Sequence, residues 1–191
     1  MDSQLKSHLE NLRTVLLSLP HSGSSGFEGL IGLTLSSITG IPFRLAGSGS
    51  QFGLDGKASF QSDPICFECK RYDKSQPREG LLAKITDLSI SEHQIDIWVL
   101  ASTASIKTQI IDDVRKAGDK SGLFVFVLDW SDSSLPILAA ALANTGKVAE
   151  DWTVTLDANN PTFTLGDFDV HTTYIDAIGT TSISIGLDPS S

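Results

Sequence analysis

The order of helix-like and strand-like segments limits the fold of this chain more than any other feature. Leucines recur at steps of three and four over residues 5–19, which predicts an amphipathic helix. A second helix is expected over 26–39, with Ser24 or Ser25 as its N-cap and Gly40 as its stop signal. The chain then changes to short β-prone runs, so the helical start is followed by a sheet.

Strands and helices follow one another in an order that indicates the fold class. Three consecutive strands are expected within residues 41–47, 52–60 and 64–72. Helices and strands then alternate: helix 78–90, strand 95–102, helix 105–117, strand 122–130 and helix 136–146. This order predicts an α/β protein with a mixed β-sheet flanked by helices on both faces. The nearly all-apolar strand 122–130 is expected to be covered on both sides.

The regular pattern ends near residue 150, and the charge changes close to the same place. Residues 1–128 carry 13 Lys and Arg against 14 Asp and Glu, whereas residues 129–191 carry one against nine, and the whole chain has a net charge of −9. We therefore expect one domain over residues 1–150. Residues 151–191 are expected to form an acidic linker or a C-terminal extension toward a further domain.

Several classes of protein are excluded by the composition. No apolar run approaches the roughly 18 residues of a membrane-spanning helix, and the N-terminus has no basic start followed by an apolar block. Two cysteines, Cys66 and Cys69, are too few for a disulfide scaffold. We expect a cytoplasmic protein that does not contact a membrane.

The residues with a chemical pattern lie on two neighbouring strands. Asp55 stands between two glycines, and Glu68-Cys69-Lys70 follows after twelve intervening residues. Because side chains alternate along a strand, Glu68 and Lys70 point to one face and Cys69 to the other. A hairpin of this length can bring Asp55 beside Glu68. Two adjacent carboxylates share a proton or a cation, and oxygen ligands in a site open to water suit Mg²⁺.

These residues resemble a known family. The spacing D-x(12)-E-x-K on a hairpin, after a helix with Glu28, is similar to the PD-(D/E)xK restriction-endonuclease-like superfamily. The strings SGSQFGLDG and ECKRY resemble its Mrr-like branch, with Glu68 where that branch often has Gln. Residues 95–143 also resemble the N-terminal nuclease effector domains of bacterial antiviral STAND NTPases. The resemblance covers about residues 24–145, and the superfamily's αβββαβ core agrees with the predicted order.

The resemblance implies a role for each matching residue. Asp55 and Glu68 would be metal ligands, Lys70 the catalytic lysine, and Glu28 the helical acidic residue that completes the metal site. Gln51 lies in the loop that approaches the substrate. The metal would be Mg²⁺, with Mn²⁺ as a substitute.

Each of these residues also has a structural interpretation. Asp55, Glu68 and Lys70 could form a cross-strand salt-bridge cluster on a solvated sheet face. Glu28, in the first turn of its helix, could simply stabilise that helix through the helix dipole. Lys57 could be solvated or could contact a phosphate. Four basic residues after the motif could be an ordinary charged surface or a phosphate-tracking edge: Arg71, Lys74, Arg78 and Lys84. The histidines are expected to be ordinary residues, because their spacing fits no metal motif. Cys66 and Cys69, three apart on a strand, are expected to be structural thiols.

The function expected from this pattern is that of an Mg²⁺-dependent endonuclease hydrolysing DNA, with double-stranded DNA as the partner. The resemblance implies the effector domain of a bacterial anti-phage defence protein. The N-terminal part has almost no net charge, so a single copy should bind DNA weakly. We therefore expect several copies to act together, as a homo-oligomer or within a larger oligomerising protein. The alternatives are a catalytically silent module of the same fold, structural or DNA-binding, and a nuclease that cleaves RNA or tRNA.

Overall fold

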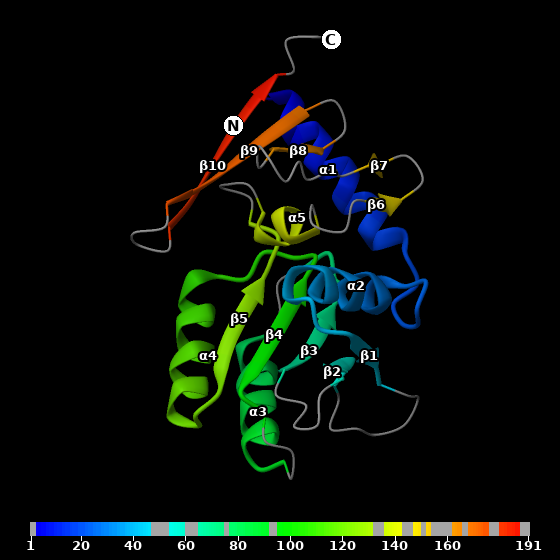
Figure 1. The fold of residues 1–191 in the computed structure, drawn as a ribbon. Coiled ribbons are helices and arrows are strands. Elements are labelled where there is room, and N and C mark those ends of the chain that lie inside the picture. The colour runs from blue at the N-terminus through cyan, green and yellow to red at the C-terminus, as the bar shows by residue number, and fades with distance from the viewer. Residues whose placement is uncertain are drawn as a thin grey trace.

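The computed structural model describes most of the first 142 residues and several strands beyond them (Figure 1). The described residues are 3–46, 54–59, 65–74, 77–91, 95–131, 136–142, 147–149, 152–153, 162–165, 168–175 and 180–187. The helices are α1 (Ser3–Ser18), α2 (Phe27–Thr39), α3 (Arg78–Ser89), α4 (Thr108–Lys120) and α5 (Ile137–Leu142). The first five strands are β1 (Phe43–Leu45), β2 (Gly56–Ala58), β3 (Ile65–Lys70), β4 (Ile97–Ser102) and β5 (Phe124–Leu128).

The two N-terminal helices form as the periodicity predicts. Leu9, Leu12 and Leu16 of α1 are buried in the core. Helix α2 ends at Gly40, which adopts the left-handed conformation (φ 69°) expected of a glycine stop.

The predicted serine N-cap of α2 is wrong. Gly26 occupies the N-cap position, and no side chain caps the helix. Carbonyl groups of the preceding loop accept hydrogen bonds from the helix start instead: Pro20 from Phe27 N–H (2.8 Å) and His21 from Glu28 N–H (3.3 Å). Since these backbone acceptors satisfy free N–H groups of the first turn, a serine hydroxyl is not needed.

Strands β1 to β5 form one mixed sheet in chain order. The pairs β1–β2 and β2–β3 are antiparallel, whereas β3–β4 and β4–β5 are parallel. The parallel pairs are joined through α3 and α4, since parallel neighbours need a crossover connection. The prediction of an α/β protein with a mixed sheet and flanking helices is confirmed.

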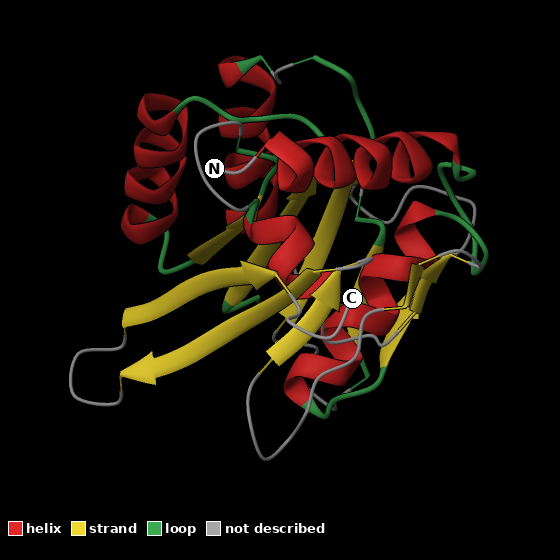
Figure 2. Cartoon of the chain, turned by 90° about the horizontal axis from the view of Figure 1, so that it is seen from above, coloured by secondary structure: helices red, strands yellow, loops and turns green. Residues whose placement is uncertain are grey.

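Helices lie on both faces of the sheet (Figures 1 and 2). A hydrophobic cluster fills the space between the sheet and the helices on each face. On one face, Phe67 and Val99 pack with residues of α1, α2 and α5. On the other, Cys66 and Trp98 pack with residues of α3 and α4. The alternation of side chains along β3 and β4 therefore sends neighbouring residues into different cores.

Strand β5 departs from its prediction. Val125 and Val127 are buried, but Phe124 and Phe126 are 59% and 42% exposed. The reason is position, because β5 is the last strand of the sheet and its second face is only partly covered. A continuous apolar run thus does not prove that both faces of a strand are buried.

The C-terminal part contains further strands. These are β6 (Lys147–Ala149), β7 (Trp152–Thr153), β8 (Thr162–Leu165), β9 (Phe168–Ile175) and β10 (Thr180–Leu187). Strands β8, β9 and β10 pair antiparallel in a three-stranded sheet, where the sequence indicates only short β-like runs. The end of the predicted helix 136–146 lies outside the described residues, and the boundary at 150 stays a prediction. Within the described residues, no helix combines the length and apolar character needed to cross a membrane.

Candidate functional site

Asp55 is fixed between β1 and β3 by its backbone. Its N–H donates a hydrogen bond to the carbonyl of Phe67 (3.1 Å), and its own carbonyl accepts one from the N–H of Ala46 (2.9 Å). The side chain is also held, because Asp55 Oδ2 accepts a hydrogen bond from the backbone N–H of Cys69 (2.5 Å). The carboxylate of Asp55 is therefore tied to β3, at the residue that follows Glu68.

Glu68 and Lys70 form an ion pair on the face of β3 that α3 covers. A second cation comes from α3, where Lys84 Nζ lies 3.7 Å from Glu68 Oε2. Glu68 is only 6% exposed and Lys84 8%. The ion pair of Glu68 with Lys70 that the structural alternative expects is present, but Glu68 and Lys84 are buried rather than solvated. Buried charges are costly to assemble, so this cluster calls for a reason beyond stability.

One oxygen of Glu68 has no hydrogen-bond donor among the described residues. This oxygen, Oε2, is buried, and Lys84 at 3.7 Å contributes charge without hydrogen-bond geometry. Leaving a buried acceptor without a hydrogen bond costs about 1–3 kcal/mol. A cation placed against this oxygen would compensate for that loss.

The environment of Asp55 makes ionisation of its carboxyl harder. Burial raises the pKa of Asp55 above its ordinary value of 3.8, in spite of the hydrogen bond from Cys69. The negative charges of Glu28 and Glu68 raise the same pKa further. Asp55 thus lies within the electrostatic influence of two other carboxylates, and a nearby divalent cation would lower the cost of its negative charge.

Lys70 keeps its proton. Burial works against its charge, but the hydrogen bond to Glu68 and the negative charges of Glu68 and Asp55 outweigh that effect, and the pKa of Lys70 is raised. An ammonium group can neutralise negative charge and donate hydrogen bonds, but it cannot remove a proton from water. The geometry therefore favours Lys70 as an electrostatic and positioning group.

Glu28 extends the acidic group from the first turn of α2. Its side chain is 12% exposed, and its Oε1 lies 3.2 Å from Nδ1 of His21. Its Oε2 accepts a hydrogen bond from the N–H of Gly23 (3.4 Å). Glu28 and Asp55 both line a pocket of about 400 Å³, together with Leu54 and neighbouring loop residues. Glu28 and Asp55 thus line the same pocket, and the role of Glu28 in a metal site stays a prediction.

His21 is the residue of this site that sequence reasoning misses. It lies on the loop between α1 and α2 and is 44% exposed. The spacing of the histidines fits no metal motif, so the sequence singles none of them out. The contact with Glu28 depends on how the loop folds back on the start of α2, and no local pattern reveals that.

The donor set fits a hard divalent cation only in part. Among the described residues, no three His, Cys, Asp or Glu side chains form a group that could hold a metal ion. Mg²⁺ does not require such a group, since it uses one or two carboxylates together with waters and phosphate oxygens. Asp55 and Glu68 supply carboxylate oxygens of this kind, and Glu68 Oε2 accepts no hydrogen bond from the described residues.

The two cysteines have no part in the site chemistry. Cys66 and Cys69 are free thiols buried in opposite cores, so the structural interpretation is confirmed. Burial raises the pKa of Cys66 to about 12, which makes it unreactive. Gln51, the remaining residue of the predicted site region, lies outside the described residues.

Most of the basic residues after the motif contact the protein itself. Arg71 Nη1 donates to the carbonyl of Leu17, and Arg78 pairs with Asp113 at 2.7 Å. Lys84 lies against Glu68. These contacts favour a structural role over the phosphate-tracking edge, and they make Lys84 part of the site.

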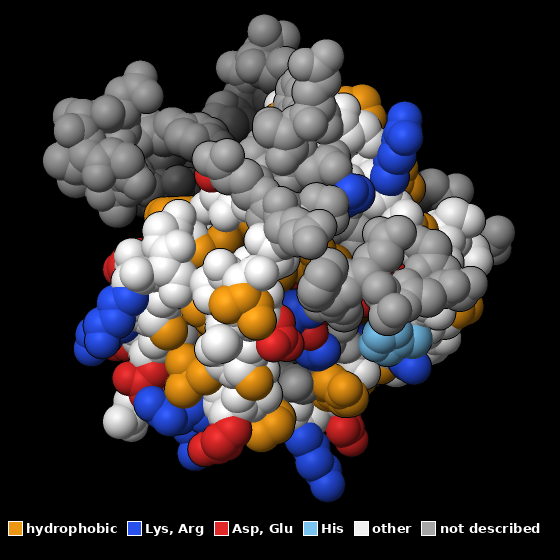
Figure 3. Space-filling model, turned by 90° about the horizontal axis from the view of Figure 1, so that it is seen from below, with side chains coloured by type: hydrophobic (Ala, Val, Ile, Leu, Met, Phe, Trp, Pro, Cys, Tyr) orange, Lys and Arg blue, Asp and Glu red, His pale blue; other side chains and the backbone are white. Residues whose placement is uncertain are grey.

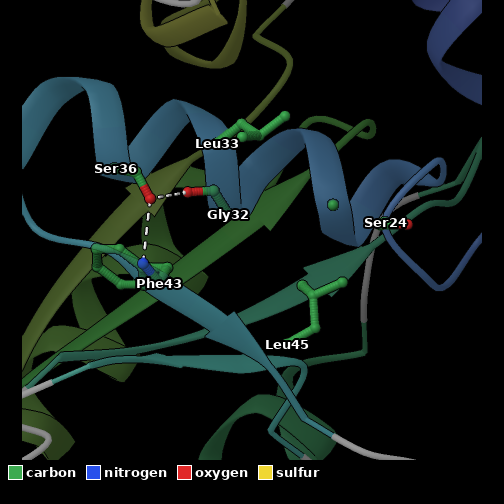
Figure 4. A pocket seen from close by; sticks show the side chains of 7 residues that line it. Ser24, Gly32, Leu33, Ser36, Phe43 and Leu45 are labelled. Atoms are coloured by element: carbon green, nitrogen blue, oxygen red, sulfur yellow. Dashed lines mark hydrogen bonds between the residues drawn. The ribbon is translucent and has the colours of Figure 1, made fainter.

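A second, more apolar pocket lies between α2 and β1 (Figure 4). It measures about 190 Å³, and its lining consists of Ser24, Gly29, Gly32, Leu33, Ser36, Phe43 and Leu45. The Ser36 hydroxyl donates to the carbonyl of Gly32 (2.8 Å) and accepts from the N–H of Phe43 (3.1 Å). Ser36 thus joins the helix to the strand, and the lining offers no charged group for catalysis.

The structure thus defines a mixed α/β protein with a cluster of Glu68, Lys70 and Lys84 between β3 and α3. Asp55 and Glu28 line a pocket beside the start of α2. Comparison of the sequence with protein-family models and with curated proteins gives no match. A function for this chain therefore has to be inferred from the site itself.

Proposed function

We propose that the chain is an Mg²⁺-dependent endonuclease of the restriction-endonuclease-like fold that hydrolyses DNA phosphodiester bonds. The proposal rests on the arrangement of Asp55, directly before β2, with Glu68 and Lys70 of β3. Among the described residues, one buried oxygen of Glu68 has no hydrogen-bond donor. The element order α2-β1-β2-β3-α3-β4 supports it, because it matches the αβββαβ core of that superfamily.

In this proposal each side chain has a defined task. Asp55 and Glu68 hold the cation, and Glu28 contributes a ligand or a contact to a bound water. Mg²⁺ bound there supplies Lewis-acid polarisation of the phosphate and activation of a water molecule. Lys70, protonated and paired with Glu68, neutralises the charge that develops on the phosphate oxygens and orients the attacking water.

The charge distribution bears on how such a domain would be used. Basic and acidic side chains are interspersed on the described surface in Figure 3, and the whole chain has a net charge of −9. A single copy should therefore bind DNA weakly, and several copies brought together would add avidity. This agrees with an effector domain of a larger, oligomerising bacterial defence protein, the role that the resemblance implies.

One observation favours the alternative of a catalytically silent module. Glu68 is already paired with two lysines, and the described residues contain no three-residue metal group. A silent module would keep this cluster for structure alone and would take up no cation. An RNA-cleaving enzyme is the other alternative, because phosphate and metal chemistry do not distinguish DNA from RNA.

A cleavage assay separates these possibilities. Purified protein is incubated with plasmid DNA, single-stranded DNA and RNA, each with Mg²⁺ and with EDTA. We expect Mg²⁺-dependent cleavage of plasmid DNA that EDTA abolishes. Cleavage of RNA alone would favour the RNA enzyme, and no cleavage of any substrate would favour the silent module.

Matched variants assign the activity to the site. Lys70→Met should lower the cleavage rate by about 10²–10³-fold, the usual loss for removing a group that stabilises transition-state charge. Lys120→Met, on the exposed end of α4, removes the same charge and should cleave like the wild type. Equal cleavage by both variants would contradict the role of Lys70.

A further inference from the structure

The face of β1 and β2 next to the site carries two basic side chains. Arg44 pairs with Lys57 across the antiparallel strands, and Lys57 pairs with Cys66 of β3. Residues that pair in this way project from the same face of a sheet. Since Cys66, Glu68 and Lys70 alternate along β3, all five side chains belong to one face.

In the part of the chain that the structure describes, the buried cluster on this face includes no side chain of β1 or β2. The buried cluster there draws its strand residues from β3, β4 and β5 and its helix residues from α3 and α4. Arg44, on the edge strand, is exposed, and Lys57 is half-buried. Within the described residues, the two cations therefore lie outside the buried cluster of this face.

The position of the pair relative to Glu68 suits an extended anion. Lys57 is in register with Cys66, two residues or roughly 6.6 Å along β3 from Glu68. Arg44 lies one strand farther out, roughly 4.8 Å away in the pairing direction. An extended anion that lies across the two strands would be attracted by both cations.

We propose that Arg44 and Lys57 form a phosphate-binding strip that holds the DNA backbone beside the cleaved bond. The identity of the ligand rests on the proposed nuclease function. The strip contacts phosphates and no bases, so it positions the strand without reading its sequence. It also directs the substrate across β1 and β2, at the opposite end of the sheet from β5.

The salt dependence of binding tests the strip. Binding of a labelled DNA duplex is measured by fluorescence anisotropy in EDTA, which prevents cleavage, over a range of salt concentrations. Removing a side chain that neutralises one phosphate should reduce the slope of log K against log [salt] by about 0.9. Between about 50 and 200 mM salt, the affinity of the wild type should thus fall roughly 3.5-fold more than that of Arg44→Ala, and roughly 12-fold more than that of Arg44→Ala/Lys57→Ala.

The matched control removes two exposed cations at the other end of the sheet. Lys116→Ala/Lys120→Ala on α4 changes the net charge equally and should leave the slope unchanged. Arg44→Lys keeps the positive charge and should keep the wild-type slope. If the double variant fails to fold, Arg44→Ala alone still tests the slope, because Arg44 is exposed. The proposed phosphate-binding strip would be refuted by any of three results. These are an unchanged slope in Arg44→Ala, an equal reduction of the slope in the control, or no DNA binding by the wild type.

The same experiment keeps the two proposals apart. If the slope falls as expected but the protein cleaves nothing with Mg²⁺, the strip stands and the nuclease function fails. If the protein cleaves DNA but the slope does not change, the function stands and the strip fails.

Discussion

Replacing Gly56 by alanine should damage both the fold and the site, because Gly56 follows Asp55 and packs on a buried ring. A Cβ atom at Gly56 would lie 2.3 and 2.4 Å from Cε1 and Cζ of Phe67, and 2.8 Å from the carbonyl oxygen of Arg44. Phe67 is fully buried and packs against Phe43, with ring centroids 6.0 Å apart. The ring has little room to move, so β2 must shift.

The expected cost follows from overpacking of a dense core. Inserting a methyl group where there is no space costs about 1–3 kcal/mol. For a chain of this size, each kcal/mol lowers the melting temperature by about 2–4 °C, so Gly56→Ala should melt about 2–12 °C lower. A shift of β2 also moves Asp55 away from the N–H of Cys69, which lies 2.5 Å from its carboxylate in the wild type, so cleavage should fall as well.

Gly32→Ala is the matched control, since it adds the same methyl group beside the same ring. Its Cβ would lie 3.6 Å from Phe67 Cζ and 3.6 Å from Leu45 Cδ2, which is ordinary contact. Within α2, alanine is favoured over glycine by about 0.5–1 kcal/mol, so this variant should be more stable than the wild type. Thermal and urea unfolding followed by circular dichroism measures both variants. Shifts of the same sign, or a Gly56→Ala variant as stable as the wild type, would refute the packing argument.

Two further predictions concern charge. Because burial and then the charges of Glu28 and Glu68 raise the pKa of Asp55 above 3.8, in spite of the Cys69 hydrogen bond, the folded protein keeps a proton on this carboxyl at pH values where the unfolded chain has lost it. As the pH rises from 3.8 through the raised pKa of Asp55, the wild type should therefore lose stability relative to Asp55→Asn. Urea unfolding at several pH values measures this difference in stability. A difference that does not change with pH would contradict the prediction. Lys84→Met removes one of the two cations beside buried Glu68 and should destabilise the fold by about 1–3 kcal/mol. This is less than the loss expected for breaking a buried ion pair completely, because Lys70 still pairs with Glu68. Lys120→Met at an exposed position should stay within about 0.5 kcal/mol of the wild type, and equal effects of the two variants would contradict the burial argument.

The sequence predicts the element order because that order depends on local periodicity. The leucine repeat of α1 and the Gly40 stop of α2 are properties of a few neighbouring residues, and the structure confirms them. The opposite orientations of Cys66 and Cys69 follow from strand alternation in the same way. Local patterns, however, do not reveal which strand ends the sheet, so the exposure of Phe124 and Phe126 could not be predicted.

The acidic part of the site was predictable, and its surroundings were not. The spacing of Asp55, Glu68 and Lys70 indicates the hairpin that brings them together. The contacts of Lys84 and His21 depend on how α3 packs on the sheet and how a loop folds back on α2. Both are long-range features, and neither residue type nor spacing encodes them locally.

The central claim is that Asp55 and Glu68 together bind a divalent cation, and a calorimetric titration with Mn²⁺ tests it most directly. The wild type should take up Mn²⁺, whereas Asp55→Asn and Glu68→Gln should not. Asp87→Asn and Glu79→Gln, exposed acidic residues of α3, should bind like the wild type. No uptake by the wild type, or unchanged uptake by Asp55→Asn and Glu68→Gln, would contradict the account.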